Sequence, residues 1–249
     1  LSHMSHEIRT PMNSIAGLTY LAREMVGEGR DDELRDYLNQ IDQSSQYLLS
    51  LLNNIMDMSK IESSKYEINA KPFNISSVLD EVYSVFSATM STKGIKLTIN
   101  SDAVTSPDVI GDEISLRKIL NNLLSNANKF TRAGGSVTIF ASQKQMNEKA
   151  AILHLEVADT GVGISEEFIG HLFEPYTQEM SENGGRAAGS GLGMAICKSM
   201  IDLQGGSISV RSRLGEGTTF YVDIPYSFGK AAVKEIEAVD CSAINGRRI

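Results

Sequence analysis

The first residues whose types suggest chemistry are a histidine and a glutamate that lie side by side, His6 and Glu7. A carboxylate beside an imidazole raises the basicity of the ring and fixes which nitrogen carries the proton, so the free nitrogen can attack a phosphorus atom. Pro11 lacks a backbone N–H, so in a helix it leaves the carbonyl of Glu7 unpaired and loosens the turn beside His6. An isolated His-Glu pair is, however, more often a solvated part of a helix surface.

A second group of polar side chains lies on one face of an expected helix. Asn122, Asn126 and Lys129 are spaced at i, i+4 and i+7. An amide oxygen is a hard ligand that suits Mg²⁺, and a lysine ammonium is a point charge that suits phosphate. Polar residues on one face are usually the solvent side of a helix, but this helix is otherwise unusually apolar. The spacing therefore favours a site for Mg²⁺ and phosphate.

Two glycine-rich stretches follow farther along the chain, at 159–164 and 189–193. In the first, the glycines let the backbone turn tightly and approach a flat ring. Asp159 can accept a hydrogen bond from the adenine amino group, whereas guanine would present a carbonyl oxygen there, so we expect ATP to bind better than GTP. The first stretch alone is a weak signal, because ordinary turns use the same residues. The second opens an expected helix, whose N-terminus can bind phosphate.

Two helices over residues 1–66 are expected to carry His6, because residues recur there with spacings of four and three. Gly27 and Gly29 break the pattern, and Asp31 or Asp32 can cap the second helix. Two antiparallel helices bury little core, so we expect two copies to pair as a four-helix bundle. Any antiparallel coiled coil fits the periodicity equally well. The expected seam is Ile8, Met12, Ile15, Thr19, Ala22 and Val26, followed by Leu34, Leu38, Ile41, Ser45, Leu48, Leu52, Ile55 and Ser59.

Behind Lys71 and Pro72 the patterns alternate between helix and strand. Together they predict an α+β sandwich with helices on one face of a mixed sheet. The polar segment 177–188 is expected to form a lid over ATP, and its Arg186 is equally a γ-phosphate ligand or a solvated side chain. The tail from Ser227 is expected to be a linker. Helices are expected at 75–93, 112–130 and 191–203, and strands at 95–100, 136–143, 151–158, 206–210 and 218–224.

The composition is that of a globular chain of two domains, with 249 residues, 41% of them hydrophobic and 22% charged. The net charge of -8 and the lack of a Lys/Arg cluster argue against nucleic acid as a partner. Cys197 and Cys241 lie far apart without a partner motif, which favours a reducing compartment. No apolar run approaches the roughly 20 residues of a membrane span. We expect a cytoplasmic piece of a longer protein, whose attachment to a membrane through a preceding sensor region stays open.

Five motifs resemble, in the same order, those of sensor histidine kinases, which join a dimerisation and phosphotransfer hairpin to a GHKL (Bergerat) ATP-binding sandwich. Residues 5–11 resemble the H-box, 116–131 the N-box, 159–164 the G1 box, 173–176 the F-box and 189–193 the G2 box. Ser190 stands where threonine is commoner, and Ala187 and Ala188 depart from the usual lid. Residues 215–218 fit either the last glycine box or an ordinary hairpin turn.

The resemblance implies that ATP phosphorylates His6, with Glu7 as its acid–base partner, and that the phosphoryl group then passes to an aspartate of a receiver domain. It also implies that Glu7 and Thr10 support dephosphorylation of that receiver, and that Asn122 is the Mg²⁺ ligand. The other implied nucleotide contacts are Asn126, Lys129, Phe130, Asp159, Gly161, Gly163, Ile164, Phe173, Tyr176, Arg186, Gly189, Ser190, Gly191, Leu192 and Gly193.

The expected domains are the phosphotransfer hairpin at 1–68, the ATP-binding sandwich at 69–228 and a linker at 229–249. Residues 245–249 resemble the lead-in to a fused receiver domain, as in hybrid kinases, although five residues are at least as well explained by a polar tail. Two other functions stay open: a GHKL ATPase that acts as a conformational switch, and a dimerisation scaffold that has lost nucleotide binding.

Overall fold

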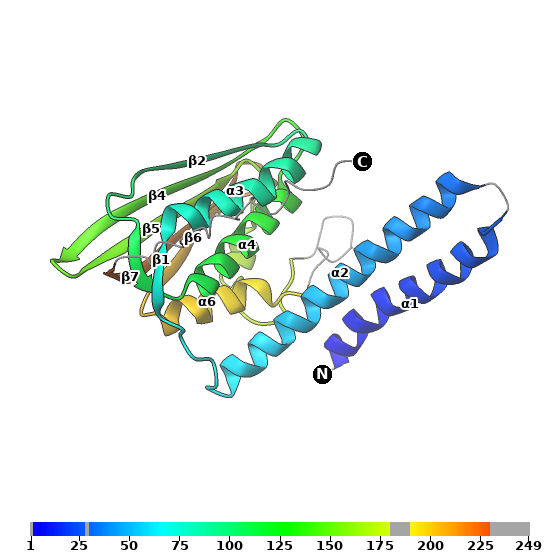
Figure 1. Cartoon of the computed structure of the whole chain (residues 1–249), viewed down its shortest axis with the longest axis horizontal. Coiled ribbons are helices and arrows are strands. Elements are labelled where there is room, and N and C mark those ends of the chain that lie inside the picture. The colour runs from blue at the N-terminus through cyan, green and yellow to red at the C-terminus, as the bar shows by residue number, and fades with distance from the viewer. Residues whose placement is uncertain (1, 28–29, 180–189, 230–249) are drawn as a thin grey trace, which may run out of the picture.

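The computed structural model describes residues 2–27, 30–179 and 190–229. A hairpin of two long helices, α1 (Ser2–Met25) and α2 (Asp31–Glu62), stands beside a sandwich of helices on a sheet (Figure 1). The expected α+β class, with a helical hairpin followed by an α/β sandwich, is confirmed. Among the described residues, no helix combines the length and apolar character that a membrane crossing requires.

The hairpin is packed along a seam that differs in part from the expected one. Pro11, Ala22 and Met25 of α1 are buried, whereas Met12 and Val26 are 54% and 70% exposed. Each helix carries two apolar stripes, and the spacing alone does not say which stripe faces the other helix. The expected seam positions that are exposed in this chain are Met12, Thr19, Val26, Leu38, Leu52 and Ser59.

The start of α2 also corrects an expectation. Arg30 occupies the N-cap position, and no side chain caps the helix there. Asp31 and Asp32 lie inside the first turn instead, where carboxylates interact favourably with the helix dipole. The Arg30 guanidinium donates to the Glu33 carboxylate over 3.0 Å, which stabilises this turn from its side chains.

The sandwich is built on a mixed seven-stranded sheet whose central strands are long and antiparallel. The strand order is β1-β3-β7-β5-β4-β2, with β6 also paired to β7, and only β2 and β4 run parallel. The strands are β1 (Lys71–Asn74), β2 (Lys96–Ala103), β3 (Asp108–Gly111), β4 (Ser136–Asn147), β5 (Ala150–Asp159), β6 (Ser207–Arg213) and β7 (Gly217–Phe228). Because β7 runs to Phe228, the expectation that the tail begins at Ser227 is wrong.

Three helices cover one face of this sheet: α3 (Ile75–Thr92), α4 (Glu113–Phe130) and α6 (Gly193–Leu203) (Figure 1). A short helix, α5 (Glu166–Ile169), follows β5. Asp112 caps α4 by accepting the N–H groups of Ile114 and Ser115, each over 3.1 Å. Every second residue of the central strands points into the core, as the period of two predicts. These core residues include Val137, Ile139, Leu153, Leu155, Val222 and Ile224.

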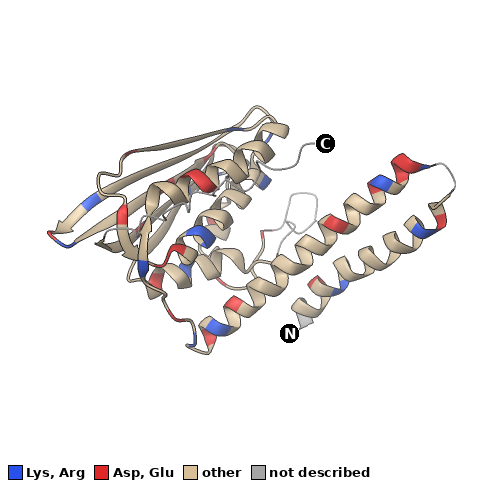
Figure 2. Ribbon diagram, viewed as in Figure 1, with Lys and Arg blue, Asp and Glu red and all other residues tan. Residues whose placement is uncertain are grey.

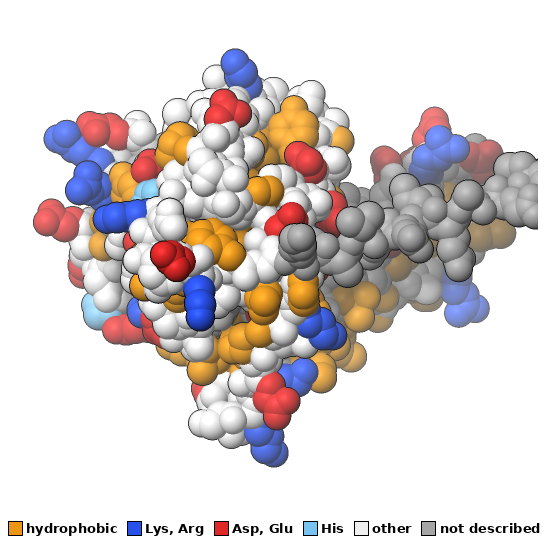
Figure 3. Space-filling model, turned by 60° about the vertical axis from the view of Figure 1, so that its left-hand side comes forward, with side chains coloured by type: hydrophobic (Ala, Val, Ile, Leu, Met, Phe, Trp, Pro, Cys, Tyr) orange, Lys and Arg blue, Asp and Glu red, His pale blue; other side chains and the backbone are white. Residues whose placement is uncertain are grey.

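Residues 63–70 connect the hairpin to the edge strand β1, and side chains join the two units at this point. Lys118 of α4 donates to the carboxylate of Asp57 on α2 over 2.7 Å. The hydroxyls of Tyr66 and Ser115 lie 2.9 Å apart. Figure 2 shows both positively and negatively charged positions on α2 toward its C-terminal end. The face drawn in Figure 3 mixes charges of both signs among apolar side chains.

Candidate phosphotransfer and nucleotide site

His6 lies near the start of α1 and is exposed, so a phosphoryl donor can reach it from solvent. The hydroxyl of Thr10 donates to the backbone carbonyl of His6 over 3.2 Å. Pro11, one residue on, is buried against α2. Because Pro11 cannot donate, the carbonyl of Glu7 has no partner at i+4 within the helix. In the turn that carries His6, the carbonyl of His6 thus gains a hydrogen bond from Thr10. The carbonyl of the next residue, Glu7, lacks its usual helical hydrogen bond.

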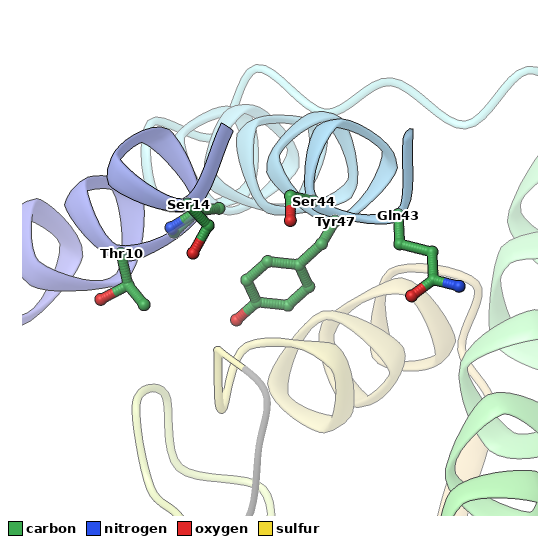
Figure 4. A pocket seen from close by; sticks show the side chains of 6 residues that line it. Thr10, Ser14, Gln43, Ser44 and Tyr47 are labelled. Atoms are coloured by element: carbon green, nitrogen blue, oxygen red, sulfur yellow. The ribbon is translucent and has the colours of Figure 1, made fainter. Parts of the chain in front are cut away.

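Glu7 points across the hairpin rather than along its own helix. Its carboxylate accepts a hydrogen bond from the hydroxyl of Tyr47 on α2 over 3.0 Å. Tyr47 also lines a shallow groove between the two helices (Figure 4). Nothing in the spacing of the sequence indicated this partner, because the two residues lie 40 positions apart. The groove is lined by Thr10, Pro11, Ser14, Gln43, Ser44 and Tyr47.

Asp159 ends the central strand β5 and is largely held by backbone groups. Its carboxylate accepts the N–H of Gly161 over 2.8 Å, and the backbone of Thr218 donates to it as well. Burial raises the pKa of Asp159, and these two hydrogen bonds oppose the rise. A Cβ on Gly161 would lie 2.7 Å from this carboxylate, so only glycine leaves the space open. The site thus presents a fixed acceptor, which is what an adenine amino group requires.

The loop after Asp159 is fixed by the turn between β6 and β7. Gly215 donates to the carbonyl of Val162 over 2.8 Å, and Ile164 donates to the Ser212 hydroxyl over 2.8 Å. Gly163 has a φ of +73°, and a Cβ there would lie 2.0 Å from the Arg213 carbonyl. Ser212 and Thr218 support this loop, and neither was predicted as a site residue. The Gly-Glu-Gly-Thr string at 215–218 was the one signal that pointed to them.

The N-box residues of α4 face the start of α6. The side-chain oxygen of Asn122 lies 3.0 Å from where a Cβ on Gly193 would stand, so a larger residue there would press on Asn122. Asn122 also hydrogen-bonds with the buried Cys197. The amide of Asn126 donates to the sulfur of Met194 over 3.3 Å. The amide oxygen of Asn122, next to a glycine, fits a Mg²⁺ ligand in the chemistry of its donor atom.

Lys129 and Phe130 end α4 together. The Lys129 ammonium lies 4.5 Å from the centroid of the Phe130 ring, a cation–π contact. Burial lowers the pKa of Lys129, because a charged ammonium is less stable away from water. Nearby phosphates would offset that cost, so both residues suit the edge of a nucleotide site.

The F-box meets the G2 box through backbone contacts. Tyr176 has a φ of 64°, which is uncommon for a residue other than glycine, and its N–H donates to the carbonyl of Gly191 over 3.0 Å. A Cβ on Gly191 would lie 2.6 Å from the Thr177 carbonyl. Phe173 and Leu192 pack into the core, and the Ser190 hydroxyl accepts the N–H of Leu192 over 3.3 Å. Arg186, Gly189 and residues 180–188 of the expected lid lie outside the described residues.

One contact links this region to the histidine. The hydroxyl of Tyr176 donates to the sulfur of Met4 on α1 over 3.4 Å. Met4 lies two residues before His6, so the F-box side of the sandwich contacts the same end of α1 that carries the expected phosphate acceptor.

Both parts of the chain match known families. Residues 1–64 match the His Kinase A (phospho-acceptor) domain, and residues 111–227 match the histidine kinase-, DNA gyrase B- and HSP90-like ATPases. The chain belongs to the histidine kinases. This kinase core therefore pairs a phospho-acceptor hairpin with a GHKL ATPase fold, as the motifs predicted.

Relatives of the kinase core are longer sensor kinases. It is 35% identical over 241 residues to the autoinducer 2 sensor kinase/phosphatase LuxQ of Vibrio harveyi, covering 95% of this chain and 27% of LuxQ. It is 33% identical over 249 residues to the signal transduction histidine-protein kinase BarA of Escherichia coli strain K12, covering 100% of this chain and 26% of BarA. The chain thus spans about a quarter of these relatives.

Among solved structures, full-length ShkA in complex with AMPPNP matches the kinase core with a TM-score of 0.68 at 30% identity. The match covers 92% of this chain and 46% of ShkA. It includes both the hairpin and the sandwich, since neither unit alone makes up 92% of the chain.

Proposed function

We propose that the kinase core binds ATP between α4 and the G1 and G2 boxes, and that it transfers the γ-phosphoryl group to His6. The observation that carries the proposal is the contact between Tyr176 and Met4, because it joins the nucleotide-binding side of the sandwich to the turn of α1 that bears the histidine. The acceptor Asp159 favours adenine over guanine.

In the proposed reaction, the free ring nitrogen of His6 forms a bond to the γ-phosphorus while the bond from that phosphorus to the β,γ-bridging oxygen breaks. ADP leaves with the bond electrons, and the imidazole proton passes to Glu7 or to water. Positioning contributes most of the acceleration in such transfers. Asn122 would hold Mg²⁺, which offsets phosphate charge when bound, and Asn126 and Lys129 would lie near the phosphates.

The nucleotide contacts proposed here fall into two groups. Asp159, with the glycines after it, would hold the base, and the residues around α6 would hold the phosphates. The full set adds Phe130, Gly161, Gly163, Ile164, Phe173, Tyr176, Ser190, Gly191, Leu192 and Gly193, together with Arg186 and Gly189 beyond the described residues. We propose domain limits of 1–68 and 69–228, with 229–249 as a linker.

We propose a homodimer through the hairpin as the working unit. Apolar residues remain exposed along α2, among them Leu38, Leu49, Leu52 and Met56, and they recur at the helical spacing that a partner helix would cover. The phosphoryl acceptor would be an aspartate of a receiver domain, separate or fused. Glu7 and Thr10 would support the later hydrolysis of that aspartyl phosphate by water. LuxQ, which is described as a kinase/phosphatase, supports both activities.

The deciding experiment is incubation with γ-labelled ATP and Mg²⁺. Label that stays on the protein in alkali and is lost in acid supports phosphohistidine, and His6→Gln should remove it while calorimetry still detects ATP binding. His154→Gln, on the open face of the sheet, is the control and should keep its label. Release of free phosphate without protein label would instead favour an ATPase switch, and failure to bind ATP would favour a scaffold.

A further inference from the structure

The hydrogen bond between Tyr47 and Glu7 crosses the hairpin at the level of the phosphate acceptor. The two residues come from different helices and their side-chain oxygens lie 3.0 Å apart. A hydroxyl that donates to a carboxylate makes a charge-assisted bond, which is stronger than a neutral one. Glu7 is the immediate neighbour of His6, so this bond fixes the group that the proposed transfer uses to accept a proton.

We propose that Tyr47 is a positioning residue for phosphorylation of His6, and that it acts by holding the Glu7 carboxylate in one orientation. The proposal rests on the proposed kinase function and adds to it a residue that neither the motifs nor the spacing assigns. Tyr47 acts in this proposal through Glu7, so it is a positioning residue and not a catalytic one.

The surroundings of Tyr47 support this role. Its ring lies in the groove beside Thr10 and Ser14 of α1 and Gln43 of α2 (Figure 4). Tyr47 is 39% exposed, and a ring that lies against two helices loses less further freedom than a fully solvated one when its hydroxyl bonds Glu7. Burial, the hydrogen bond to Glu7 and the charge of Glu7 raise the pKa of Tyr47 to about 12. The hydroxyl therefore keeps its proton, and remains a donor, across the neutral pH range.

A hairpin hydroxyl of this kind has a simpler alternative, which is that it only stabilises the packing of α1 on α2. The two roles differ in a double-mutant cycle. If Tyr47 acts through Glu7, then Tyr47→Phe should slow labelling when Glu7 is present and should add little once Glu7 has been changed to Ala, which removes the acceptor. A packing role would lower the rate by the same factor in both backgrounds.

We expect Tyr47→Phe to lower the maximal rate of labelling about 3- to 10-fold, the worth of one hydrogen bond, with the KM for ATP unchanged. Tyr20→Phe, which removes an exposed hydroxyl from α1, is the matched control and should label at the rate of the unmodified chain. If the unmodified chain labels and Tyr47→Phe labels equally fast, Tyr47 has no positioning role. If the unmodified chain does not label at all, the proposed kinase function fails instead.

A second measurement does not depend on activity, because Glu7→Ala can label too slowly to time. Tyrosine-selective ¹³C NMR should show a lower pKa for Tyr47 in Glu7→Ala than in the unmodified chain, because the hydrogen bond and the charge of Glu7 both raise it. An unchanged titration of Tyr47 in that variant would mean that the bond does not form in solution, and it would overturn the proposal.

Discussion

Lys118 of α4 and Asp57 of α2 form an ion pair of 2.7 Å that joins the catalytic sandwich to the hairpin. The two partners are unequally exposed, since the Asp57 side chain is 12% exposed and that of Lys118 is 39%. Because of this difference in exposure, we expect removal of Lys118 to destabilise the junction more than removal of Asp57.

We expect Lys118→Met to weaken the junction by about 2 kcal/mol, because it leaves a nearly buried carboxylate without its cation. Asp57→Asn should cost only about 1 kcal/mol, because the more exposed ammonium can turn to water. Limited proteolysis of residues 63–70 measures the opening of the junction. Equal cleavage rates in the two variants would contradict the asymmetry.

The amide of Asn122 provides a test of the proposed metal site. Asn122→Asp should reduce autophosphorylation more than tenfold, because a carboxylate beside the phosphates adds repulsion and replaces a neutral oxygen ligand of Mg²⁺ by a charged one. The neighbouring Asn121 on α4 is exposed, so Asn121→Asp is a matched control for the added charge. Unchanged labelling of Asn122→Asp would remove this residue from the metal site.

Two glycines separate the cost of backbone conformation from that of crowding. Gly163 and Gly134 both have positive φ, +73° and +84°, but only Gly163 has an atom in the way of a Cβ. We expect Gly134→Ala to lower the free energy of unfolding by about 1 kcal/mol and Gly163→Ala by more than about 3 kcal/mol. Denaturant titration of both variants measures the difference, and equal losses would show that Gly163 is not crowded in solution.

His154 on the open face of the sheet should make stability depend on pH. Burial alone would lower the pKa of His154, but hydrogen bonds to Asp223 over 2.6 Å and Glu156 over 3.2 Å raise it above its ordinary value. The folded state therefore holds this proton more tightly than the unfolded state. Its stabilisation is complete below the unfolded pKa of about 6.5 and disappears as the pH rises through the folded pKa.

The measurement is the free energy of unfolding between pH 6 and pH 9, with and without the imidazole. The unmodified chain should lose stability over this range, and His154→Gln should show a flatter dependence. A slope that is the same in both proteins would mean that His154 does not carry the effect.

The sequence predicted most accurately the elements whose signals are local. Helix α4 was expected at 112–130 and begins one residue later, at Glu113, because Asp112 is its N-cap. The short strands β1, at the edge of the sheet, and β3, beside it, were not predicted, since each has four residues and their pairing partners lie far away along the chain. Strands that short carry too few alternations to stand out.

In the site too, features with local sequence signals were predicted and features that depend on long-range contacts were not. The glycine motifs indicated Asp159 and Gly163 because backbone geometry at those positions tolerates few residues. The Tyr47–Glu7 bond was not foreseeable, because it depends on the register between two helices. Met12 and Val26 of the expected seam are exposed in the hairpin for a related reason: periodicity finds an apolar stripe but does not say whether the other helix or a second copy covers it.

The connection from Glu62 to Lys71 limits how far the sandwich can travel. Its eight residues, 63–70, span at most about 28 Å when extended. Along α2, Glu62 lies about 22 Å from Tyr47, the residue level with the histidine turn. The extended length of this linker is therefore slightly greater than the distance along α2 to the turn that carries His6. The sandwich can leave its docked position and still reach that turn. A linker of this length keeps the effective concentration of the ATP site near His6 high, whatever the concentration of the protein in solution.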